Sequence, residues 1–421
     1  MWNTIKNALS YLWYVLTMDW FQLISTVIDI LILVWTAICW RDVVQQPSLL
    51  LVLLAVLVNF IWQVFNVAEH FKFLKKENPA SPLVSLLKDA GQRRDFSRIE
   101  VNRELSQLQY PYDNDLGNGV LENHEVSRIL RETDIPIKPL LSRAKMKETR
   151  TYIRQYQETL LKFLNHKWYE VSQNGGKFTN DRKICFASEV YQVDGVYQWR
   201  ITEGCYYNGY LTNTIYTQYI GGSHYKLYPP MNMLNTSIGP LGDSDFSDHI
   251  GVSTMLYTND GYVVVFRQAG NAGQYPNKYV PSGSGSLDFA DFEDDEDIRT
   301  VVVRGAEREL GEETSLAKNL LLRDRDRMNI VIDTKVLRYY RDMERGGKPE
   351  FCCISMVNKP KDFIKEYVAP SEEELANEKN WKLLADDALW QEELLPSASL
   401  SLKMNYVAVK EYMARRKFER A

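Results

Sequence analysis

Two long apolar stretches near the N-terminus constrain the fold of this chain more than any other feature. One stretch runs from Trp20 to Trp40 and the other from Ser48 to Ala68, and each matches the roughly 20 residues that a helix needs to span a bilayer. Trp35 and Trp62 add aromatic residues of the kind that favour membrane interfaces. The sequence therefore predicts two transmembrane helices joined as a hairpin, with Asn7 to Met18 lying along the interface or extending the first helix.

The distribution of basic residues orients this hairpin. The connecting loop from Arg41 to Pro47 holds one basic residue, whereas lysines and arginines recur after the second stretch, from Lys72 to Arg94. Cytoplasmic flanks of membrane helices are enriched in Lys and Arg. Both the N-terminus, which carries Lys6, and the C-terminal bulk of the chain are therefore predicted to be cytoplasmic.

Asp29, Asn59 and Gln63 stand out among the residues of the two apolar stretches. A carboxyl group at bilayer depth costs about 2.5 to 3.5 kcal/mol on insertion scales, so it should face other helices or water. Asn59 and Gln63 are four residues apart and share one helix face. Three interpretations stay open for Asp29: snorkelling near the interface, a role with Asn59 and Gln63 in helix association, or a place on a water-lined path.

Composition bounds the rest of the chain. Its 421 residues are enough for two or three domains. A net charge of -5 argues against a nucleic-acid polymer as partner, whereas small anionic nucleotides stay compatible. The five cysteines show no metal-binding or disulfide spacing, which favours a reducing compartment. Four segments are predicted: a membrane anchor over 1–76, a linker with an amphipathic stretch over 77–110, a helical and β-rich extension over 111–246, and a final domain over 247–421.

The predicted extension contains a helical part and a tyrosine-rich part. Apolar residues recur at helical spacing from Pro139 to Tyr169, which predicts one long amphipathic helix. From Ile184 to Tyr228 the sequence alternates with a period of two and predicts strands and exposed turns. Its tyrosines either stack on nucleobases or cover half-buried sheet surface. The candidates for a base-binding wall are Tyr206, Tyr207, Tyr210 and Lys226.

The final domain begins with a strand pattern and continues into an acidic helix. Gly251 to Arg267 predicts a β-hairpin, and the Gly-rich run Pro281 to Ser286 predicts a turn before the helix. Further strands are predicted over 329–340 and 349–358, and a closing helix over 406–420.

Three glutamates on the predicted helix are the strongest site signal in the chain. Glu309, Glu312 and Glu313 stand at i, i+3 and i+4, so they share one face of the helix. Like charges stacked in this way repel unless a cation lies among them, and Mg²⁺ or Mn²⁺ suits carboxylate oxygens. Arg308 could hold one of the glutamates. The alternative is a solvated acidic face with no ligand.

At these residues the chain resembles the Nudix family, whose box reads Gly, five residues, Glu, seven residues, Arg-Glu-aliphatic-x-Glu-Glu-x-Gly-aliphatic. Arg308 to Glu313 match the second half of the box, while Thr300 stands in place of the first Glu and Ser315 in place of the closing Gly. On this resemblance the first Gly is Gly283 or Gly285, and residues 288–297 are an insertion.

The resemblance implies an α+β chain in which a two-helix transmembrane hairpin is followed by a Nudix-like α/β/α domain with an N-terminal helical and β-rich extension. Family members use the box glutamates to hold Mg²⁺ or Mn²⁺ beside a diphosphate, and metal-bound water attacks phosphorus. Glu309, Glu312 and Glu313 would then be both the metal ligands and the catalytic residues, oriented by Arg308. The degenerate half-box favours binding over turnover. Basic residues that could contact phosphate are Arg267, Lys278, Arg304 and Arg338.

The combination of membrane helices with a Nudix box resembles the SMODS-associated Nudix effectors of cyclic-oligonucleotide-based antiphage signalling (CBASS). This resemblance implies that a functionally linked nucleotidyltransferase makes a cyclic oligonucleotide, which the cytoplasmic domain binds. The chain would then form homo-oligomers and disrupt the bacterial inner membrane. One alternative is a membrane-anchored, Mg²⁺-dependent Nudix hydrolase of nucleoside diphosphate derivatives. Another is a subunit of an oligomeric transporter or channel.

Overall fold

The computed structural model describes residues 2–18, 20–40, 45–75, 100–101, 103–113, 119–173, 178–214, 237–268, 277–294, 296–316, 330–369 and 375–419. The chain divides into two compact units. The first unit comprises Met1–Arg94, Lys147–Asp181 and Tyr206–Met233, and the second comprises Asp95–Met146, Arg182–Cys205 and Leu234–Ala421. Each unit is therefore assembled from separate parts of the chain, whereas the segments predicted from the sequence are contiguous.

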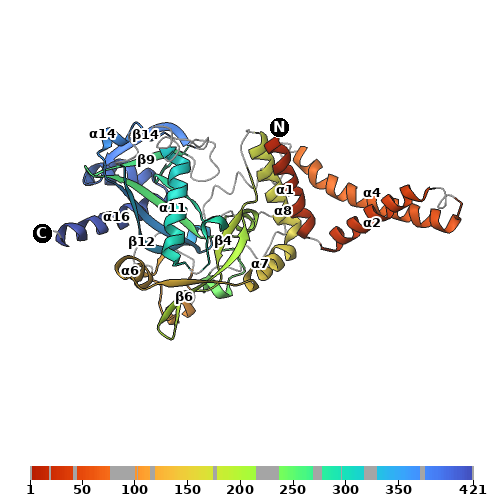
Figure 1. Cartoon of the computed structure of the whole chain (residues 1–421), viewed down its shortest axis with the longest axis horizontal. Coiled ribbons are helices and arrows are strands. Elements are labelled where there is room, and N and C mark those ends of the chain that lie inside the picture. The colour runs from red at the N-terminus through yellow and green to blue at the C-terminus, as the bar shows by residue number, and fades with distance from the viewer. Residues whose placement is uncertain are drawn as a thin grey trace. The chain divides into compact units, whose positions relative to one another are not determined.

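The described secondary-structure elements of the first unit are all helical. Its elements are α1 (Trp2–Met18), α2 (Trp20–Ile38), α4 (Pro47–Lys75), most of α7 (Ala144–Gln155), α8 (Gln157–Gln173), α9 (Tyr206–Gly209) and a π-helical turn, η3 (Tyr210–Thr214). Helices α2 and α4 run side by side as a hairpin (Figure 1). The prediction of one long helix from Pro139 to Tyr169 is wrong, because Pro139 belongs to a strand and Tyr156 lies in a turn between α7 and α8.

Helix α1 is a separate element that packs inside the first unit. Tyr11, Tyr14 and Met18 are buried, and the Tyr11 ring stacks on Trp168 of α8 with 5.4 Å between ring centroids. The Tyr14 hydroxyl donates a hydrogen bond of 2.8 Å to Oδ1 of Asn208. These contacts give α1 a packing role at the base of the hairpin.

The second unit is built on a mixed eight-stranded sheet. Its main strand order is β10-β9-β8-β13-β12-β2, with β11 paired to β8 and β14 paired to β9. The strands are β2 (Val120–Glu122), β8 (Gly251–Thr258), β9 (Tyr262–Gln268), β10 (Tyr279–Val280), β11 (Gly283–Ser286), β12 (Ile332–Asp342), β13 (Lys348–Val357) and β14 (Leu375–Leu383). Strands β8 and β13 are parallel, and the other pairs are antiparallel. The predicted hairpin and the predicted strands β12 and β13 are confirmed.

One helix covers each face of this sheet (Figure 1). Val264 and Phe266 of β9 pack with Leu310 of α11 (Ile298–Thr314), whereas Val263 and Val265 pack with residues of α16 (Leu400–Glu419). Successive side chains of a strand point to opposite faces, so a continuous apolar run serves both cores. The unit is thus a mixed α+β structure with an α/β/α layer order, and α16 confirms the predicted closing helix.

A second, four-stranded sheet forms the β-rich extension. Strand order is β3-β6-β4, with β5 paired to β6. Its strands are β3 (Ile137–Leu141), β4 (Arg182–Phe186), β5 (Tyr191–Val193) and β6 (Val196–Cys205). The predicted strand pattern therefore holds up to Cys205, but residues 206–214 are helical and 215–236 lie outside the described residues.

Short elements complete the second unit. They are the paired strands β1 (Glu100–Val101) and β7 (Ser237–Ile238), helix α6 (His124–Glu132), and η2 (Arg103–Gln107), η5 (Leu241–Asp243), η6 (Phe289–Asp291), η7 (Met343–Arg345), α14 (Lys361–Ile364), α15 (Asp387–Leu389), η8 (Trp390–Leu394) and η9 (Leu395–Ser397). The predicted linker from residue 77 and its amphipathic stretch lie outside the described residues up to residue 99.

Candidate functional site

Helix α11 carries the three predicted glutamates and is defined at both ends. Asp297 caps the N-terminus by accepting a hydrogen bond of 2.9 Å from the backbone N–H of Arg299. Ser315 ends the helix in the left-handed conformation, with a φ of 54°. A helix most often uses Gly at such an end, because Gly adopts this conformation without steric cost. The sequence resemblance leads us to expect a Gly at this position, and Ser315 adopts the left-handed conformation there instead.

The Gly-rich run before α11 is strand β11, not the predicted turn. A Cβ atom at Gly283 would lie 2.6 Å from the backbone of Leu310, and one at Gly285 would lie 2.2 Å from the carboxyl carbon of Glu309. Both glycines therefore allow β11 to approach α11 at the turn that bears the glutamates. Close backbone approach explains why glycine stands at both positions.

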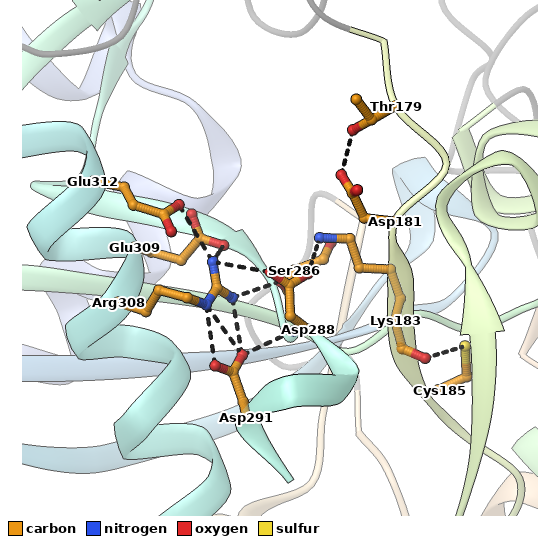
Figure 2. Close-up of polar contacts among 10 residues, drawn as sticks. All are labelled: Thr179, Asp181, Lys183, Cys185, Ser286, Asp288, Asp291, Arg308, Glu309 and Glu312. Atoms are coloured by element: carbon orange, nitrogen blue, oxygen red, sulfur yellow. Dashed lines mark hydrogen bonds and ion pairs between the residues drawn. The ribbon is translucent and has the colours of Figure 1, made fainter. Parts of the chain in front are cut away.

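Arg308 is the centre of the polar cluster (Figure 2). Its Nη2 lies 2.9 Å from Oδ2 of Asp291, and its Nη1 lies 2.9 Å from Oε1 of Glu309 and 3.4 Å from Oε2 of Glu312. Its Nη2 also donates a hydrogen bond of 3.1 Å to the carbonyl oxygen of Ser286. The predicted role of Arg308 in holding a glutamate is matched by this geometry.

Two members of this cluster carried no recognisable sequence signal as site residues. Asp288 and Asp291 belong to the acidic run that the family resemblance treats as an insertion, yet Asp291 is buried and its carboxylate also accepts a hydrogen bond of 2.8 Å from the Asp288 backbone. Lys183 of β4 forms an ion pair with Asp288. The acidic run is therefore part of the site, since it supplies the counter-charge for Arg308.

The three glutamates differ in burial and therefore in their electrostatic environment. The Glu309 residue is 7 % exposed and Glu313 is buried, whereas Glu312 is exposed. Loss of hydration raises the pKa of Glu309 to about 7, although the nearby Arg308 opposes this rise. Ser284 of β11 donates a hydrogen bond of 3.4 Å to Oε1 of Glu313. Near neutral pH the site therefore holds a carboxyl group that exchanges a proton readily.

The arrangement does not fit a ready Mg²⁺ or Mn²⁺ centre. Among the residues that the structure describes, no group of three or more His, Cys, Asp or Glu side chains is placed to hold a metal ion. Arg308 draws Glu309 and Glu312 toward its own guanidinium group, which supplies the positive charge that the stacked carboxylates need. Two cations, Arg308 and Lys183, face the carboxylates of Asp288, Asp291, Glu309 and Glu312, so each carboxylate has a cationic partner although the cluster keeps a formal negative charge.

The other predicted phosphate contacts are dispersed over the second unit. Arg267 is exposed on β9 and donates a hydrogen bond of 3.3 Å to the carbonyl of Asn277, and Lys278 is half-buried beside β10. Arg304 of α11 forms an ion pair of 2.7 Å with Glu296. Arg338 lies on β12 and is treated below. The described residues thus do not converge into one phosphate-binding cluster around α11.

The predicted base-binding tyrosines belong to the first unit. Tyr207 is fully buried, stacks on Phe178 with 5.2 Å between ring centroids, and donates a hydrogen bond of 3.0 Å to the Phe178 carbonyl. Tyr210 is buried and Tyr206 is half-buried. The alternative of a packing role accounts for the placement of Tyr207 and Tyr210. Lys226 lies outside the described residues.

The structure brings the predicted membrane residues together within one chain. Nδ2 of Asn59 and Nε2 of Gln63 donate hydrogen bonds of 2.7 and 3.1 Å to Oδ2 of Asp29. Nε2 of Gln63 also contacts Oγ of Ser25 at 2.8 Å, and Thr26 donates a hydrogen bond to Oε1 of Gln63. We call Ser25, Thr26, Asp29, Asn59 and Gln63 the hairpin polar cluster.

The hairpin is polar inside and apolar outside. Asp29 is 4 % exposed, whereas Leu31 is 62 % exposed and further large apolar side chains of α2 and α4 are also exposed. Such an inverted pattern suits a pair of helices surrounded by lipid. In the part of the chain that the structure describes, one segment, Pro47–Phe65, is long and apolar enough to cross a membrane, and Ile24–Ile38 is apolar but shorter.

Comparison with known proteins gave structural likenesses alone. No family model and no curated protein matches the chain. Similar solved structures include a MutT protein from Methanosarcina mazei Go1, with 16% identity, a TM-score of 0.26, and coverage of 40% of this chain and 94% of that chain. An Ap4A hydrolase from C. elegans has 18% identity, a TM-score of 0.24, and coverage of 39% and 98%. A Nudix hydrolase from M. smegmatis has 14% identity, a TM-score of 0.22, and coverage of 40% and 88%.

These likenesses span about two fifths of this chain. At such TM-scores they carry no argument about activity.

Replacing Glu309 by Gln is expected to change how stability depends on pH. The folded protein holds the Glu309 proton up to about pH 7, whereas the unfolded chain releases it near pH 4.5, so wild-type stability falls as pH rises between these values. Glu309→Gln lacks this loss and should gain up to about 3 kcal/mol over wild type between pH 5 and pH 8. Denaturant unfolding of the full chain in detergent at both pH values measures the gain, and a difference that is constant with pH would contradict it.

Proposed function

We propose that this chain is a membrane-bound effector of bacterial antiphage defence, whose cytoplasmic Nudix-like domain binds a cyclic oligonucleotide and whose helical hairpin then disrupts the inner membrane. The observation that carries the proposal is the inverted hairpin. Its exposed apolar surface needs a lipid environment, and its polar interior offers groups through which helices can associate. The excess of basic residues after the second apolar stretch favours cytoplasmic placement of both termini.

The state of the α11 cluster favours binding over turnover. Arg308 contacts both Glu309 and Glu312, and the buried Asp291 secures Arg308 from a second side. A cluster held in this way is suited to keep a rigid shape around β11 and α11. This supports a domain that retains the layer order of a nucleotide-processing fold while serving as a receptor.

A mechanism for membrane disruption follows from the thermodynamic linkage between ligand binding and assembly. A ligand shifts an equilibrium only by its difference in affinity between two states, so the cyclic oligonucleotide must favour an assembled state of the chain. Assembly brings hairpins of several chains together. The hairpin polar cluster, which is satisfied within one chain, can then exchange hydrogen-bond partners between chains at small net cost. A nucleotidyltransferase that responds to phage would supply the signal.

Calorimetry on the full chain in detergent tests the proposal. Cyclic di- and trinucleotides are titrated with and without Mg²⁺, and each mixture is then analysed for products. We expect one cyclic oligonucleotide to bind tightly and to remain intact. Absence of binding across the panel, together with Mg²⁺-dependent cleavage of linear nucleoside diphosphates, would overturn the proposal.

A membrane-anchored Nudix hydrolase is the second candidate. The pKa of Glu309, raised to about 7, favours it, because a group that titrates near neutral pH is suited to general acid or base chemistry. Glu312→Gln separates the two candidates, since it should remove Mg²⁺-dependent turnover from a hydrolase and leave the affinity of a receptor for an intact cyclic nucleotide within about twofold.

A further inference from the structure

A cavity of about 470 Å³ lies in the second unit at some distance in sequence from the acidic run and α11. Its lining comes from α6, from β12, from the edge strand β2 and from α16. Sites for small molecules commonly enclose roughly 300 to 1,000 Å³, so this cavity has the capacity for a ligand of nucleotide size. None of its lining residues belongs to α11 or β11.

Four arginines from three elements line this cavity, which we call the arginine cavity. They are Arg128 and Arg131 of α6, Arg338 of β12 and Arg415 of α16. The carboxylates of Glu122, Glu132 and Glu411 lie among them, and Glu125 pairs with Arg128 from outside the lining, so the four guanidinium groups have four carboxylate partners. Burial also raises the pKa of Glu122, which favours its neutral form and so reduces the negative charge of the lining.

Arg338 is the innermost of the four arginines. It is 3 % exposed, and its Nη2 and Nη1 lie 2.7 Å from Oε2 of Glu411 and 3.1 Å from Oε2 of Glu122. Its Nε donates no hydrogen bond among the described residues. A buried donor without an acceptor is costly. An acceptor supplied by a ligand would remove this cost.

The remaining arginines are oriented by contacts that use only part of their N–H donors. Nη2 of Arg131 lies 2.7 Å from Oε1 of Glu132, which also pairs with Arg415, and Nη1 of Arg131 donates a hydrogen bond of 3.2 Å to the carbonyl of Leu337. Arg128 pairs with Glu125 at 2.6 Å. A guanidinium group carries five N–H donors, so each arginine keeps donors beyond these contacts. The carboxylates therefore orient the arginines without exhausting them.

We infer that the arginine cavity is a second ligand site, which binds a phosphate-bearing anion of up to nucleotide size. Guanidinium groups match phosphate oxygens through paired N–H donors, and their planar shape is set before the ligand arrives. Four such groups around one cavity can contact more than one phosphate. Where the proposed function holds, this cavity is the place at which the phosphodiesters of the cyclic oligonucleotide bind.

Inorganic pyrophosphate and the panel of cyclic di- and trinucleotides serve as probes on the full chain in detergent. Affinities are measured by calorimetry for wild type, Arg131→Gln and Arg415→Gln, which alter partly exposed side chains, so that folding does not depend on the buried Arg338. Arg182→Gln is the matched control, because Arg182 is an exposed, ion-paired arginine that does not line the cavity. Circular dichroism of each variant checks that it is folded.

We expect at least one probe to bind wild type and Arg182→Gln equally, and to bind Arg131→Gln and Arg415→Gln at least tenfold more weakly. Pyrophosphate binding with this pattern, but no cyclic-nucleotide binding, would uphold the site and count against the proposed function. A cyclic nucleotide that binds all four proteins equally would uphold the proposed function and overturn the cavity as its site. If no probe binds, or if every probe is insensitive to both cavity variants, the inference fails.

Discussion

Where the proposed function holds, Asp29→Ala is expected to abolish the membrane leakage triggered by the cyclic oligonucleotide, while leaving the affinity for that ligand within about twofold of wild type. Asp29 is the acceptor shared by Asn59 and Gln63, so its removal takes the centre out of the hairpin polar cluster. Hydrogen bonds between membrane helices contribute about 0.6 to 1.7 kcal/mol each, and an assembly of several hairpins multiplies the loss. Dye release from liposomes containing the full chain measures leakage, and calorimetry measures affinity.

Two further variants make this result specific. Leu31→Ala changes an exposed apolar residue of the same helix and should leak as wild type does. Asp29→Asn keeps an oxygen acceptor without the charge, so it should retain part of the leakage. Loss of ligand affinity in Asp29→Ala would count against a hairpin role that is separate from binding. Leakage from Asp29→Ala without any ligand would identify the cluster as a lock that keeps the hairpin closed, contrary to a role in association.

Local patterns predicted the elements of this chain well where the pattern has one dominant period. The continuous apolar run in Tyr262 to Arg267, with its turn at Gly261, predicted β9 and the hairpin to β8. Helical spacing predicted that Glu309, Glu312 and Glu313 share one face of α11. These features are encoded within a few residues of one another. A strand or a helical turn is determined by residues that are close together in the sequence, so it can be predicted from the sequence alone.

Partners that are distant along the chain escaped prediction for a physical reason. Arg308 was expected to hold a glutamate, but it also pairs with Asp291, which lies in a run interpreted as an insertion. Lys145 of α7 and Asp248 form a buried ion pair, with 2.7 Å between Nζ and Oδ2. Asp248 directly precedes His249, which pairs with Cys185 of β4 in an isolated bridge. Such pairs depend on which elements pack together, and no local period carries that information.

The long helix predicted from Pro139 to Tyr169 shows the opposite error. Apolar residues in this region do recur at helical spacing, yet Pro139 pairs with Trp199 in a parallel ladder between β3 and β6. Sheet pairing there overrides the local pattern, because the strand gains backbone hydrogen bonds and burial of Ile137. The arginine cavity is likewise a product of packing, since its lining joins α6, β12 and α16, which are far apart in the sequence. The contact between Glu132 and Arg415 illustrates this, because the two residues are 283 positions apart.

Arg308→Met is expected to reduce the free energy of unfolding of the second unit by about 3 to 5 kcal/mol, the usual cost of removing one partner from a buried ion pair. The substitution leaves the buried carboxylates of Asp291 and Glu309 without their shared cation. Denaturant unfolding of the full chain in detergent measures the loss. Arg182→Met, which removes an exposed arginine, should change stability by less than about 1 kcal/mol. A loss from Arg308→Met no larger than this control would contradict a central role for Arg308.

The response of the melting temperature to Mg²⁺ tests whether the carboxylates bind a cation once Arg308 is removed. If Arg308 fills the place of a cation, millimolar Mg²⁺ should raise the melting temperature of Arg308→Met and leave that of wild type nearly unchanged, because only the variant has carboxylates in need of positive charge. Asp291→Asn in the Arg308→Met background should recover stability without Mg²⁺, since it removes one of the repelling charges. A wild-type protein that is stabilised by Mg²⁺ as strongly as the variant would mean that Arg308 yields its glutamates to a metal, and that result would favour the hydrolase over the receptor.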